Sequence, residues 1–317
     1  MTSETMIGID VAKNELVIDS GCAIVALTNT QAAIDHWLGE LPKGSYIALE
    51  ATGAYHQLMV NRAVSMGMKV YLLNPRDLRH YAQGLGRRSK TDRVDARIIR
   101  RFLLSEHRHL RAYQAPTEVE QQLALLQRRR ATLVKQRQAL QKSLADVDEL
   151  KTALKTAVNA LNDLLDVIDQ QMKTLLTTQP ELHQHSKRLQ SIPGIGKQTS
   201  VQLAVLFSRV KLTHSDAAVA FVGLDPRAAD SGLKKGRRRL SKRGSSELRR
   251  LLYNCAQAAV RTALWKPFYT TLREREFKTT EALVIIARKL LRIAFGIWKQ
   301  ESSMFDAQKV QCLKFSS

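Results

Sequence analysis

The feature that most constrains the fold of this chain is a long central segment without a helix breaker. Residues 117–179 contain no Gly and no Pro, and Pro116 and Pro180 stand at the two ends. Within this segment, apolar residues recur at alternating intervals of four and three, which is the heptad spacing of a coiled coil. The positions of this heptad seam are Val119, Leu123, Leu126, Arg130, Leu133, Arg137, Leu140, Leu144, Val147, Lys151, Leu154, Val158, Leu161, Leu165, Ile168, Met172 and Leu175.

The few polar positions of the heptad seam are all basic: Arg130, Arg137 and Lys151. An apolar seam sustained over this length needs a partner helix, from the same chain or from a second one. Because residues 117–179 carry no turn signal, we expect one long helix that pairs with another subunit. A hairpin that folds back on itself is the alternative.

The heptad seam separates two parts of the chain that differ in charge. Residues 1–115 carry 15 basic and 11 acidic residues, a net charge of +4, and residues 116–180 carry 9 and 8, a net charge of +1. Residues 181–317 carry 26 and 10, so +16 of the total of +21 lies there. Charge concentrated in this way predicts a surface that binds a polyanion such as a nucleic acid. We expect these three ranges to be separate domains: residues 1–115, a coiled coil at 116–180 and a basic C-terminal domain at 181–317.

Composition excludes several classes of protein. With 44% hydrophobic and 25% charged residues, the chain resembles a globular protein rather than a disordered one. The N-terminus lacks a signal pattern, and no apolar run approaches the ~18 residues of a membrane span. Cys22, Cys255 and Cys312 are too few and too far apart for a disulfide framework or a Cys-rich zinc site. These features predict a cytoplasmic protein without a membrane partner.

The first 115 residues alternate between strand and helix signals. Strands are predicted at 6–12, 15–19, 23–29, 46–51 and 69–75, and helices at 31–41, 55–67 and 91–106. Three meandering strands followed by alternating helices and strands predict an α/β domain with a mixed sheet. Its first three strands should be antiparallel and its later ones parallel. That order matches the ribonuclease H-like fold.

Four acids occupy informative positions in this domain. Asp10 follows an apolar strand, Glu50 ends another, and Asp92 and Asp95 stand three residues apart at the start of a helix. Acids at the ends of neighbouring strands, with acids from a covering helix, can surround Mg²⁺ ions, which prefer hard oxygen ligands. Taken singly, Asp10 fits a turn, and Asp92 and Asp95 fit the helix dipole. An acid inside an apolar strand is costly without a cation or partner, so as a set the four favour a metal site.

The basic part opens with a turn motif. Residues 191–197 read Ser-Ile-Pro-Gly-Ile-Gly-Lys and precede an apolar helix predicted at 199–207. A Pro-Gly-x-Gly turn before a helix is typical of helix-hairpin-helix modules, whose backbone N–H groups hold a DNA phosphate. We therefore take Gly194, Gly196 and Lys197 as candidate nucleic-acid contacts, with a plain turn as the alternative.

A second basic stretch follows. Residues 227–250 contain ten basic residues against Asp230 and Glu247. Such a run is ordinarily a charged face exposed to solvent. With so few acids, however, its basic side chains repel one another unless a counter-charge is bound. Aromatic residues are sparse there, so phosphate contact is favoured over base stacking. The candidate nucleic-acid contacts are Lys234, Lys235, Arg237, Arg238, Arg239, Lys242 and Arg243.

Five sequence blocks, in this order, closely resemble the DEDD recombinases of bacterial insertion sequences. This is the insertion sequence 110 family, which includes the Piv DNA invertases. The blocks are GIDVAKNEL from residue 8, LEATGAYH from residue 49, NPRDLRHYAQGLGRRSKTDRVDARII from residue 74, LQSIPGIGKQTS from residue 189 and AFVGLDPRAADSGLKKGRRRLSKRGSSELRRLLY from residue 220. The resemblance covers nearly the whole chain.

The resemblance implies a RuvC-like catalytic domain, a coiled coil and a mainly α C-terminal transposase domain. It implies that the four DEDD acids are Asp10, Glu50, Asp92 and Asp95, and that the family's active serine, in a Ser-Gly-x-x-x-Gly stretch, is Ser231. It also implies a bacterial, nucleoid-associated homo-oligomer, dimeric or tetrameric. The partners of such a protein are double-stranded donor and target DNA and a structured guide (bridge) RNA.

Together these features predict an RNA-guided, Mg²⁺-dependent transposase of an insertion sequence. Its strand cleavage and exchange would pass through a covalent phosphoserine at Ser231, with Arg237, Arg238 and Arg239 neutralising phosphate charge. A hydrolytic Holliday-junction-type nuclease, with the same four acids and no serine nucleophile, is one alternative. A non-enzymatic nucleic-acid-binding protein is the other.

Overall fold

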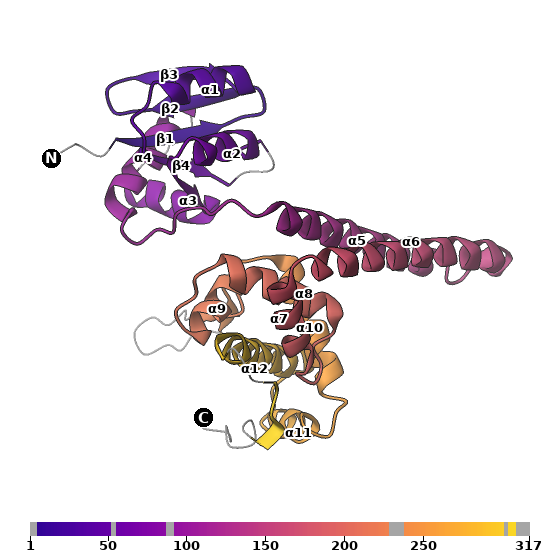
Figure 1. The fold of residues 1–317 in the computed structure, drawn as a ribbon. Coiled ribbons are helices and arrows are strands. Elements are labelled where there is room, and N and C mark those ends of the chain that lie inside the picture. Colours follow the sequence, from indigo (N-terminus) through magenta and orange to yellow (C-terminus); the bar gives the residue numbers. More distant parts are fainter. Residues whose placement is uncertain (1–4, 52–54, 87–91, 228–237, 301–303, 309–317) are drawn as a thin grey trace. The chain divides into compact units, whose positions relative to one another are not determined.

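The chain folds into two compact units, residues 1–115 and 116–317 (Figure 1). The computed structural model describes residues 5–51, 55–86, 92–227, 238–300 and 304–308. Each unit has its own hydrophobic core.

The first unit is a five-stranded sheet with helices on both faces (Figure 1). Its elements are β1 (Met6–Val11), β2 (Glu15–Asp19), β3 (Ile24–Thr28), α1 (Gln31–Gly39), β4 (Tyr46–Glu50), α2 (Gln57–Ser65), β5 (Lys69–Leu73), α3 (Pro75–Gly84) and α4 (Asp92–Glu106). The strands lie in the order β3-β2-β1-β4-β5. β1, β2 and β3 pair antiparallel, whereas β4 runs parallel to both β1 and β5. The mixed sheet expected from the sequence is therefore confirmed.

α3 is the helix of this unit that the sequence patterns did not predict. The sequence predicts that a strand ends at Pro75, whereas Pro75 occupies the first turn of the helix, where its missing N–H is not needed. The side chain of Asn74 accepts a hydrogen bond from the backbone N–H of Arg76 at 2.9 Å and caps the helix. The Asn-Pro pair is thus a helix start rather than only a strand stop.

Alternation along the strands directs side chains to the two faces of the sheet. Ile7 and Ile9 of β1 and Ile47 of β4 are buried in a cluster with residues of α1 and α2. Met6 and Ala48 are buried on the opposite face, in a cluster with residues of α3 and α4. Even-numbered residues of β1 and β4 therefore face α4.

The second unit is mainly helical (Figure 1). Its described elements are α5 (Glu118–Ser143), the 3-10 helix η1 (Asp148–Leu150), α6 (Lys151–Thr177), α7 (Pro180–Gln190), α8 (Lys197–Arg209), α9 (Ser215–Val222), β6 (Pro226–Arg227), β7 (Arg239–Leu240), α10 (Ser246–Ala259), α11 (Lys266–Glu274) and α12 (Thr279–Lys299). The two short strands form an antiparallel pair.

The prediction of one long central helix is wrong. The chain reverses between Ser143 and Lys151, and α6 packs back along α5 as a helical hairpin. The reversal needs neither Gly nor Pro, because Leu144 closes α5 and Val147 adopts an extended conformation (φ −106°, ψ 95°) before η1. The heptad seam of α5 thus finds its partner in the same chain. Heptad periodicity specifies that a helix must be covered, but not by which helix.

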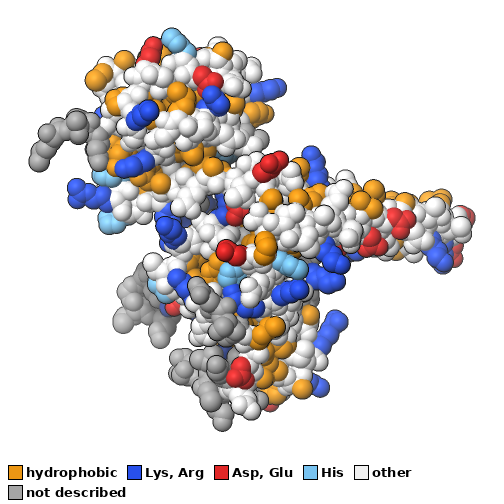
Figure 2. Space-filling model, in the orientation of Figure 1, with side chains coloured by type: hydrophobic (Ala, Val, Ile, Leu, Met, Phe, Trp, Pro, Cys, Tyr) orange, Lys and Arg blue, Asp and Glu red, His pale blue; other side chains and the backbone are white. Residues whose placement is uncertain are grey.

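The basic positions of the seam have polar partners within the hairpin. Arg130 of α5 donates two hydrogen bonds to Asp169 of α6, at 2.7 and 3.0 Å. Arg137 donates to the side-chain oxygen of Asn162, also on α6, at 2.5 Å. Both pairs fit an antiparallel register, which they help to fix. Figure 2 shows acidic and basic side chains interspersed along this hairpin, in keeping with the near-neutral charge of residues 116–180.

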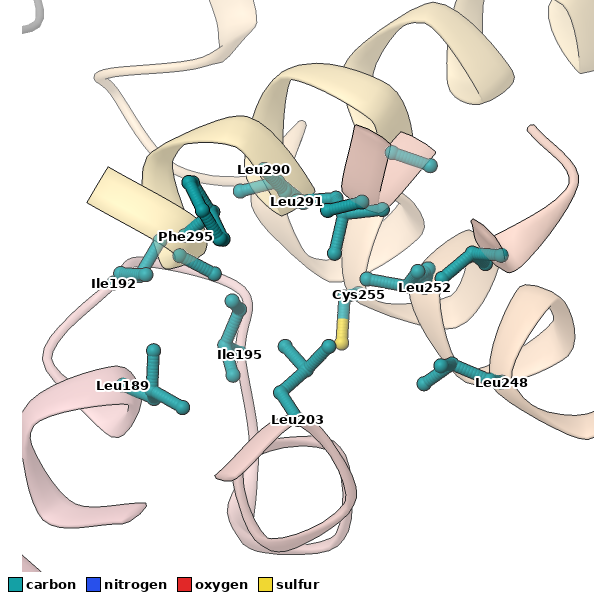
Figure 3. Close-up of a cluster of buried hydrophobic side chains, with 14 of the residues drawn as sticks. Leu189, Ile192, Ile195, Leu203, Leu248, Leu252, Cys255, Leu290, Leu291 and Phe295 are labelled. Atoms are coloured by element: carbon teal, nitrogen blue, oxygen red, sulfur yellow. The ribbon is translucent and has the colours of Figure 1, made fainter. Parts of the chain in front are cut away.

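The core of the second unit forms where α7, α8, α10 and α12 meet. The turn between α7 and α8 contributes two buried side chains, Ile192 and Ile195. Figure 3 shows them turned into the same cluster as Leu203 of α8, Cys255 of α10 and Phe295 of α12. The turn motif is therefore part of the core as well as part of the surface.

Gly194 allows this turn to approach α10. Its φ of +100° lies in the left-handed region, and an added Cβ would lie 2.6 Å from the carbonyl oxygen of Cys255 and 2.7 Å from the Cβ of Ala259. Gly196, two residues later, has a φ of −88° and no atom within 4 Å of an added Cβ. The two glycines of the motif thus meet different constraints.

We expect Gly194→Ala to lower the free energy of unfolding by about 2–4 kcal/mol, since it adds both backbone strain and overpacking. Gly196→Ala is the matched control. It should lower the free energy of unfolding by less than about 1 kcal/mol, because Gly196 provides no side-chain cap to α8 and an added Cβ meets no neighbouring atom. Thermal melts of the two variants test this difference. Equal melting temperatures would show that the turn does not depend on its contact with α10.

Candidate active site

Asp10 and Glu50 lie side by side at one edge of the sheet. β1 and β4 run parallel with Ile9 beside Leu49, so the next residues, Asp10 and Glu50, occupy neighbouring positions at the carboxyl ends of both strands. Both are even-numbered residues of the strands that direct Met6 and Ala48 to the α4 face, and both are half-buried. The two carboxylates therefore share an edge and a face.

α4 crosses this face against β1, and Gly8 makes the approach possible. An added Cβ on Gly8 would lie 2.3 Å from the backbone nitrogen of Arg100 and 2.4 Å from the carbonyl oxygen of Ala96. Farther along α4, the Nε of Arg100 donates a hydrogen bond to the carbonyl oxygen of Met6 at 2.9 Å. Since Arg100 lies toward the Met6 end of β1, the first turn of α4 lies toward the Asp10 end.

This orientation directs Asp95 to the edge that Asp10 and Glu50 occupy. Asp95 is half-buried and immediately precedes Ala96, the residue that packs on Gly8. Asp92 begins α4, although its side chain lies outside the described part of the chain. Within the described residues, no three His, Cys, Asp or Glu side chains are grouped closely enough to hold a metal ion. The structure thus places three of the four predicted acids toward one edge without assembling a closed ligand set.

The chemistry of these donors fits a magnesium ion. Carboxylate oxygens are hard ligands of the kind Mg²⁺ takes, and it is usually bound by one or two carboxylates together with waters and substrate phosphates. A site that needs substrate oxygens is not complete in the protein alone.

Asn29 joins the loops that follow the two acidic strands. Its Nδ2 donates hydrogen bonds to the carbonyl oxygen of Ala12, after β1, at 3.0 Å and to that of Tyr55, after β4, at 3.2 Å. The sequence patterns did not single out this residue, which stands between β3 and the start of α1. An Asn next to a helix N-cap carries no signal of contacts this distant in sequence.

The turn motif of residues 191–197 joins α7 to α8, which pack against each other as a helical pair. Gly196 is the N-cap of α8, and both Gly196 and Lys197 are exposed, whereas Gly194 faces α10. Gly196 and Lys197 are therefore placed where an anion can reach the N-terminus of α8, and Gly194 has a packing role.

The basic stretch is described only in part. Ser231, Lys234, Lys235 and Arg237 lie outside the described residues. Arg238, Arg239, Lys242 and Arg243 are exposed. β6 and β7 pair through Arg227 and Arg239, so residues 228–237 leave from and return to one antiparallel strand pair.

Two of the ten basic residues of this stretch serve the fold. Arg249 donates hydrogen bonds to the carbonyl oxygens of Val222 and Gly244, at 3.0 and 2.6 Å. Arg250 pairs with Glu247 one turn away in α10 at 2.6 Å, and this hydrogen-bonded guanidinium holds the pKa of Glu247 below its usual value. These two arginines are therefore committed to contacts within the chain.

Arg288 of α12 is a further candidate phosphate contact, and the sequence patterns did not single it out. Burial lowers its pKa, the nearby Arg292 lowers it further, and Asp225 raises it. Asp225 precedes β6, and its side chain accepts a hydrogen bond from the hydroxyl of Ser241, just after β7. A half-buried guanidinium therefore lies near Asp225, which precedes β6. Arginine remains charged under such a shift.

The turn motif and the basic stretch do not converge on one spot. Gly194 packs against the C-terminal half of α10, whereas Arg243 precedes the N-cap of the same helix, Ser245. At 1.5 Å per residue, α10 separates the two features by about 18 Å. The two predicted phosphate-binding features therefore contact different parts of a nucleic acid if both engage it.

No helix in the described part of the chain is long and apolar enough to cross a membrane.

Two protein-family models match the chain. A model of DEDD transposases of the IS110 type, described as "Transposase", matches residues 7–174, and one described as "Transposase IS116/IS110/IS902 family" matches residues 186–270. The first match alone covers more than half of the chain.

Curated relatives match over almost the full length. The pilin gene-inverting protein of Moraxella lacunata is 28% identical, with 94% of this chain and 97% of that protein covered. The transposase for insertion sequence element IS1328 of Yersinia enterocolitica is 27% identical, with 95% and 98% covered. The transposase for insertion sequence element IS1111A of Coxiella burnetii is 24% identical, with 81% and 78% covered.

These matches define the class of protein: the chain is a DNA recombinase enzyme. It belongs to the IS110 family of DEDD transposases, so the family expected from the sequence blocks is confirmed.

Because α4 rests on the backbone of β1, we expect Gly8→Ala to displace α4 together with Asp92 and Asp95 in its first turn. The variant should lose about 2–3 kcal/mol of stability through overpacking and most of its DNA cleavage activity. Gly39→Ala is the matched control: no atom lies within 4 Å of an added Cβ at this end of α1. Its stability should change by less than about 1 kcal/mol. Melting curves and cleavage of labelled DNA test both variants, and a fully active Gly8→Ala protein would contradict the role given to this contact.

Proposed function

We propose that this transposase recombines donor and target DNA under the guidance of a structured RNA, with Mg²⁺ and a serine nucleophile. The observation that supports this most strongly is the placement of Asp10 and Glu50 on adjacent parallel strands, under a helix that begins with Asp92 and Asp95. Carboxylates in this arrangement suit metal-assisted phosphoryl transfer.

We infer a ribonuclease H-like, RuvC-like fold for residues 1–115. The order β3-β2-β1-β4-β5, with three antiparallel strands followed by parallel ones, supports this assignment. The acids at the carboxyl ends of β1 and β4 support it further, because ligands of such sheets bind beyond the carboxyl ends of the strands.

Asp10, Glu50, Asp92 and Asp95 are the residues that would hold Mg²⁺. When bound, the ion supplies Lewis acidity toward the scissile phosphate. The acids themselves orient the reacting strand at the edge of the sheet, and Asn29 keeps the loops beyond β1 and β4 tied together at that edge.

Ser231 is the proposed nucleophile. Its hydroxyl gives up its proton to a nearby base, and its oxygen bonds to phosphorus while the bond from phosphorus to the leaving strand oxygen breaks. The leaving oxygen takes up a proton, and the protein is left joined to DNA through a phosphoserine. Arg237, Arg238 and Arg239 would stabilise the negative charge that develops on the phosphate. The mechanism requires Ser231 and the acids of residues 1–115 to act on one phosphate.

A homo-oligomer, dimeric or tetrameric, is proposed to form through the α5–α6 hairpin. The heptad seams of α5 and α6 pack against each other within the hairpin. Outside the seam, the side chains of Leu125, Leu164 and Val167 are 45%, 52% and 55% exposed. Large apolar side chains along one projecting hairpin support a contact with a second copy. The charge of +16 in residues 181–317 supports binding of the guide RNA and of both DNA duplexes.

The serine mechanism predicts a covalent protein–DNA adduct. With guide RNA, Mg²⁺ and labelled DNA, the unmodified protein should form an adduct that survives denaturing electrophoresis, and Ser231→Ala should form none and cleave no strand. Asp10→Asn should also stop cleavage, through loss of a metal ligand rather than of the nucleophile. Both variants should still bind DNA, because the basic surface is intact.

Two outcomes separate the alternatives. Normal cleavage by Ser231→Ala, without an adduct in the unmodified protein, would leave the hydrolytic Holliday-junction-type nuclease. Unchanged behaviour of Asp10→Asn, with binding but no cleavage by either protein, would leave a nucleic-acid-binding protein without catalysis.

The metal proposal predicts stabilisation by Mg²⁺. Acids held at one edge repel one another, so binding of the cation should stabilise the fold. At saturating Mg²⁺ the free energy of unfolding should rise by about 1–3 kcal/mol, and the melting temperature should rise with it. Asp95→Asn should reduce this shift by at least half. Glu40→Gln is the control, since Glu40 is exposed at the end of α1 and belongs to no proposed ligand set. An identical Mg²⁺ response in all three proteins would count against the site.

A further inference from the structure

A basic cavity lies in the first unit, which carries only +4 of the chain's net charge of +21. It has a volume of about 730 Å³ and lies between α4 and the turn that joins β2 to β3. Arg93, Arg97, Arg100 and Arg101 line it from the helix, and Gly21 and Cys22 are among the residues that line it from the turn. We call this the α4 arginine cavity.

The four arginines belong to one side of α4. They follow one another at intervals of four, three and one residues, which brings them to a common face of the helix. At a rise of 1.5 Å per residue, the row extends over about 12 Å. Arg93, Arg97 and Arg101 are exposed, so their charged groups are accessible to a ligand.

Arg100 is fixed in place by the fold. Its Nε donates to the carbonyl oxygen of Met6 at 2.9 Å, and its guanidinium packs on the backbone of Gly21, where an added Cβ would lie 2.3 Å from Nη2. Gly21 has a φ of +90°, which favours glycine at this turn. The turn and the helix are therefore held together at the floor of the cavity.

The charge of the cavity is not compensated from within the described residues. Asp19 is the acid among the lining residues, and it is buried, with its carboxylate accepting a hydrogen bond from the backbone N–H of Gly21 at 2.9 Å. Within the described part of the chain, none of the four arginines forms an ion pair with an acid. Four guanidinium groups along one wall repel one another unless an anion lies between them.

The row of arginines starts at the catalytic edge and leads away from it. Arg93 directly follows Asp92, whereas Asp19 pairs with Gly8, two residues before Asp10 on β1, and the turn at Gly21 and Cys22 lies beyond Asp19. A strand whose reacting phosphate lies at the acids can therefore continue along α4. With ~3.4 Å of axis per nucleotide, about 12 Å of helix matches roughly three successive phosphates.

We infer that the α4 arginine cavity binds the sugar–phosphate backbone of a nucleic-acid strand next to the reacting phosphate. Guanidinium groups suit this role because they bind phosphate oxygens bidentately and remain charged. The inference rests on the proposed function in taking a nucleic acid as the substrate and the four acids as the place of the reacting phosphate. It assigns binding to the unit of low net charge.

Cys22 provides a local probe of this cavity. Of the cysteines that the structure describes, Cys22 is exposed and lines the cavity, whereas Cys255 is buried. Burial raises the pKa of the Cys255 thiol, so it carries less thiolate and reacts slowly with alkylating agents. Alkylation of the full-length protein by N-ethylmaleimide, followed on the peptide that contains Cys22, therefore reports occupancy of the cavity.

The experiment compares the free protein with its complex with a single-stranded oligonucleotide, as DNA and as RNA of the same sequence. Saturating oligonucleotide should slow the alkylation of Cys22 about tenfold or more, whereas inorganic phosphate alone should not. Whichever strand protects Cys22 identifies the source of the bound backbone. A complex that forms in a mobility-shift assay while Cys22 reacts at the free rate overturns the inference. Equal protection by inorganic phosphate also overturns it, in favour of a small-anion site.

Variants provide the second measurement. Arg97→Ala with Arg101→Ala removes two exposed charges from the cavity and retains helix propensity. Arg79→Ala with Arg111→Ala removes two exposed charges of the same unit outside it. The first pair should abolish protection of Cys22, weaken binding about tenfold and reduce the slope of log K against log salt by about 1.4, for two lost contacts to a single strand. The control pair should retain protection, and equal effects of the two pairs would overturn the inference.

These outcomes are independent of the reaction mechanism. In the Asp10→Asn protein the oligonucleotide should still protect Cys22 from alkylation, because this substitution removes no cationic group. If the unmodified protein protects Cys22 but cleaves no DNA, the cavity assignment stands and the proposed reaction fails. If it cleaves DNA while Cys22 stays unprotected in the complex, the reaction stands and the cavity assignment fails.

Discussion

The contact between the backbones of α4 and β1 at Gly8 is the constraint on which the candidate active site depends. It aligns the helix along the strand, so that α4 starts at the edge where β1 and β4 end. The same contact buries one face of the sheet and places the first turn of α4, which carries Asp95, toward the edge of Asp10 and Glu50. Core packing and the placement of the acids thus depend on the same contact, because a side chain at Gly8 would interfere with both.

α4 also shows how net charge conceals local charge. The first unit has a net charge of only +4, yet one face of α4 carries four arginines while its first turn carries two acids. A helix separates groups by their angle around its axis and by their height along it, so one element can carry opposite charges at different places. Carboxylates suit a cation and guanidinium groups suit phosphates.

In the second unit, glycines and polar pairs decide how the helices meet. Gly194 lets the α7–α8 turn enter the core against α10, and the Arg130–Asp169 pair aligns α5 with α6. The exposed basic residues near β7 are arranged around a strand pair, whereas Arg249 and Arg250 are held within the fold. Part of the high positive charge of this unit therefore serves the fold itself.

The sequence by itself determined the five strands of the first unit and all of its helices except α3, because apolar periodicity reflects which face of each element is buried. It also determined that Asp10 and Glu50 end neighbouring strands, and that Asp92 and Asp95 open a helix. Only the tertiary structure decided that the heptad seam closes on itself, since the same spacing suits a partner helix in either chain. The tertiary structure alone likewise decided that Gly8 meets α4 and that Arg100 meets the β2–β3 turn. Those contacts join residues about 80 or more positions apart, and local periodicity carries no information about partners at that separation.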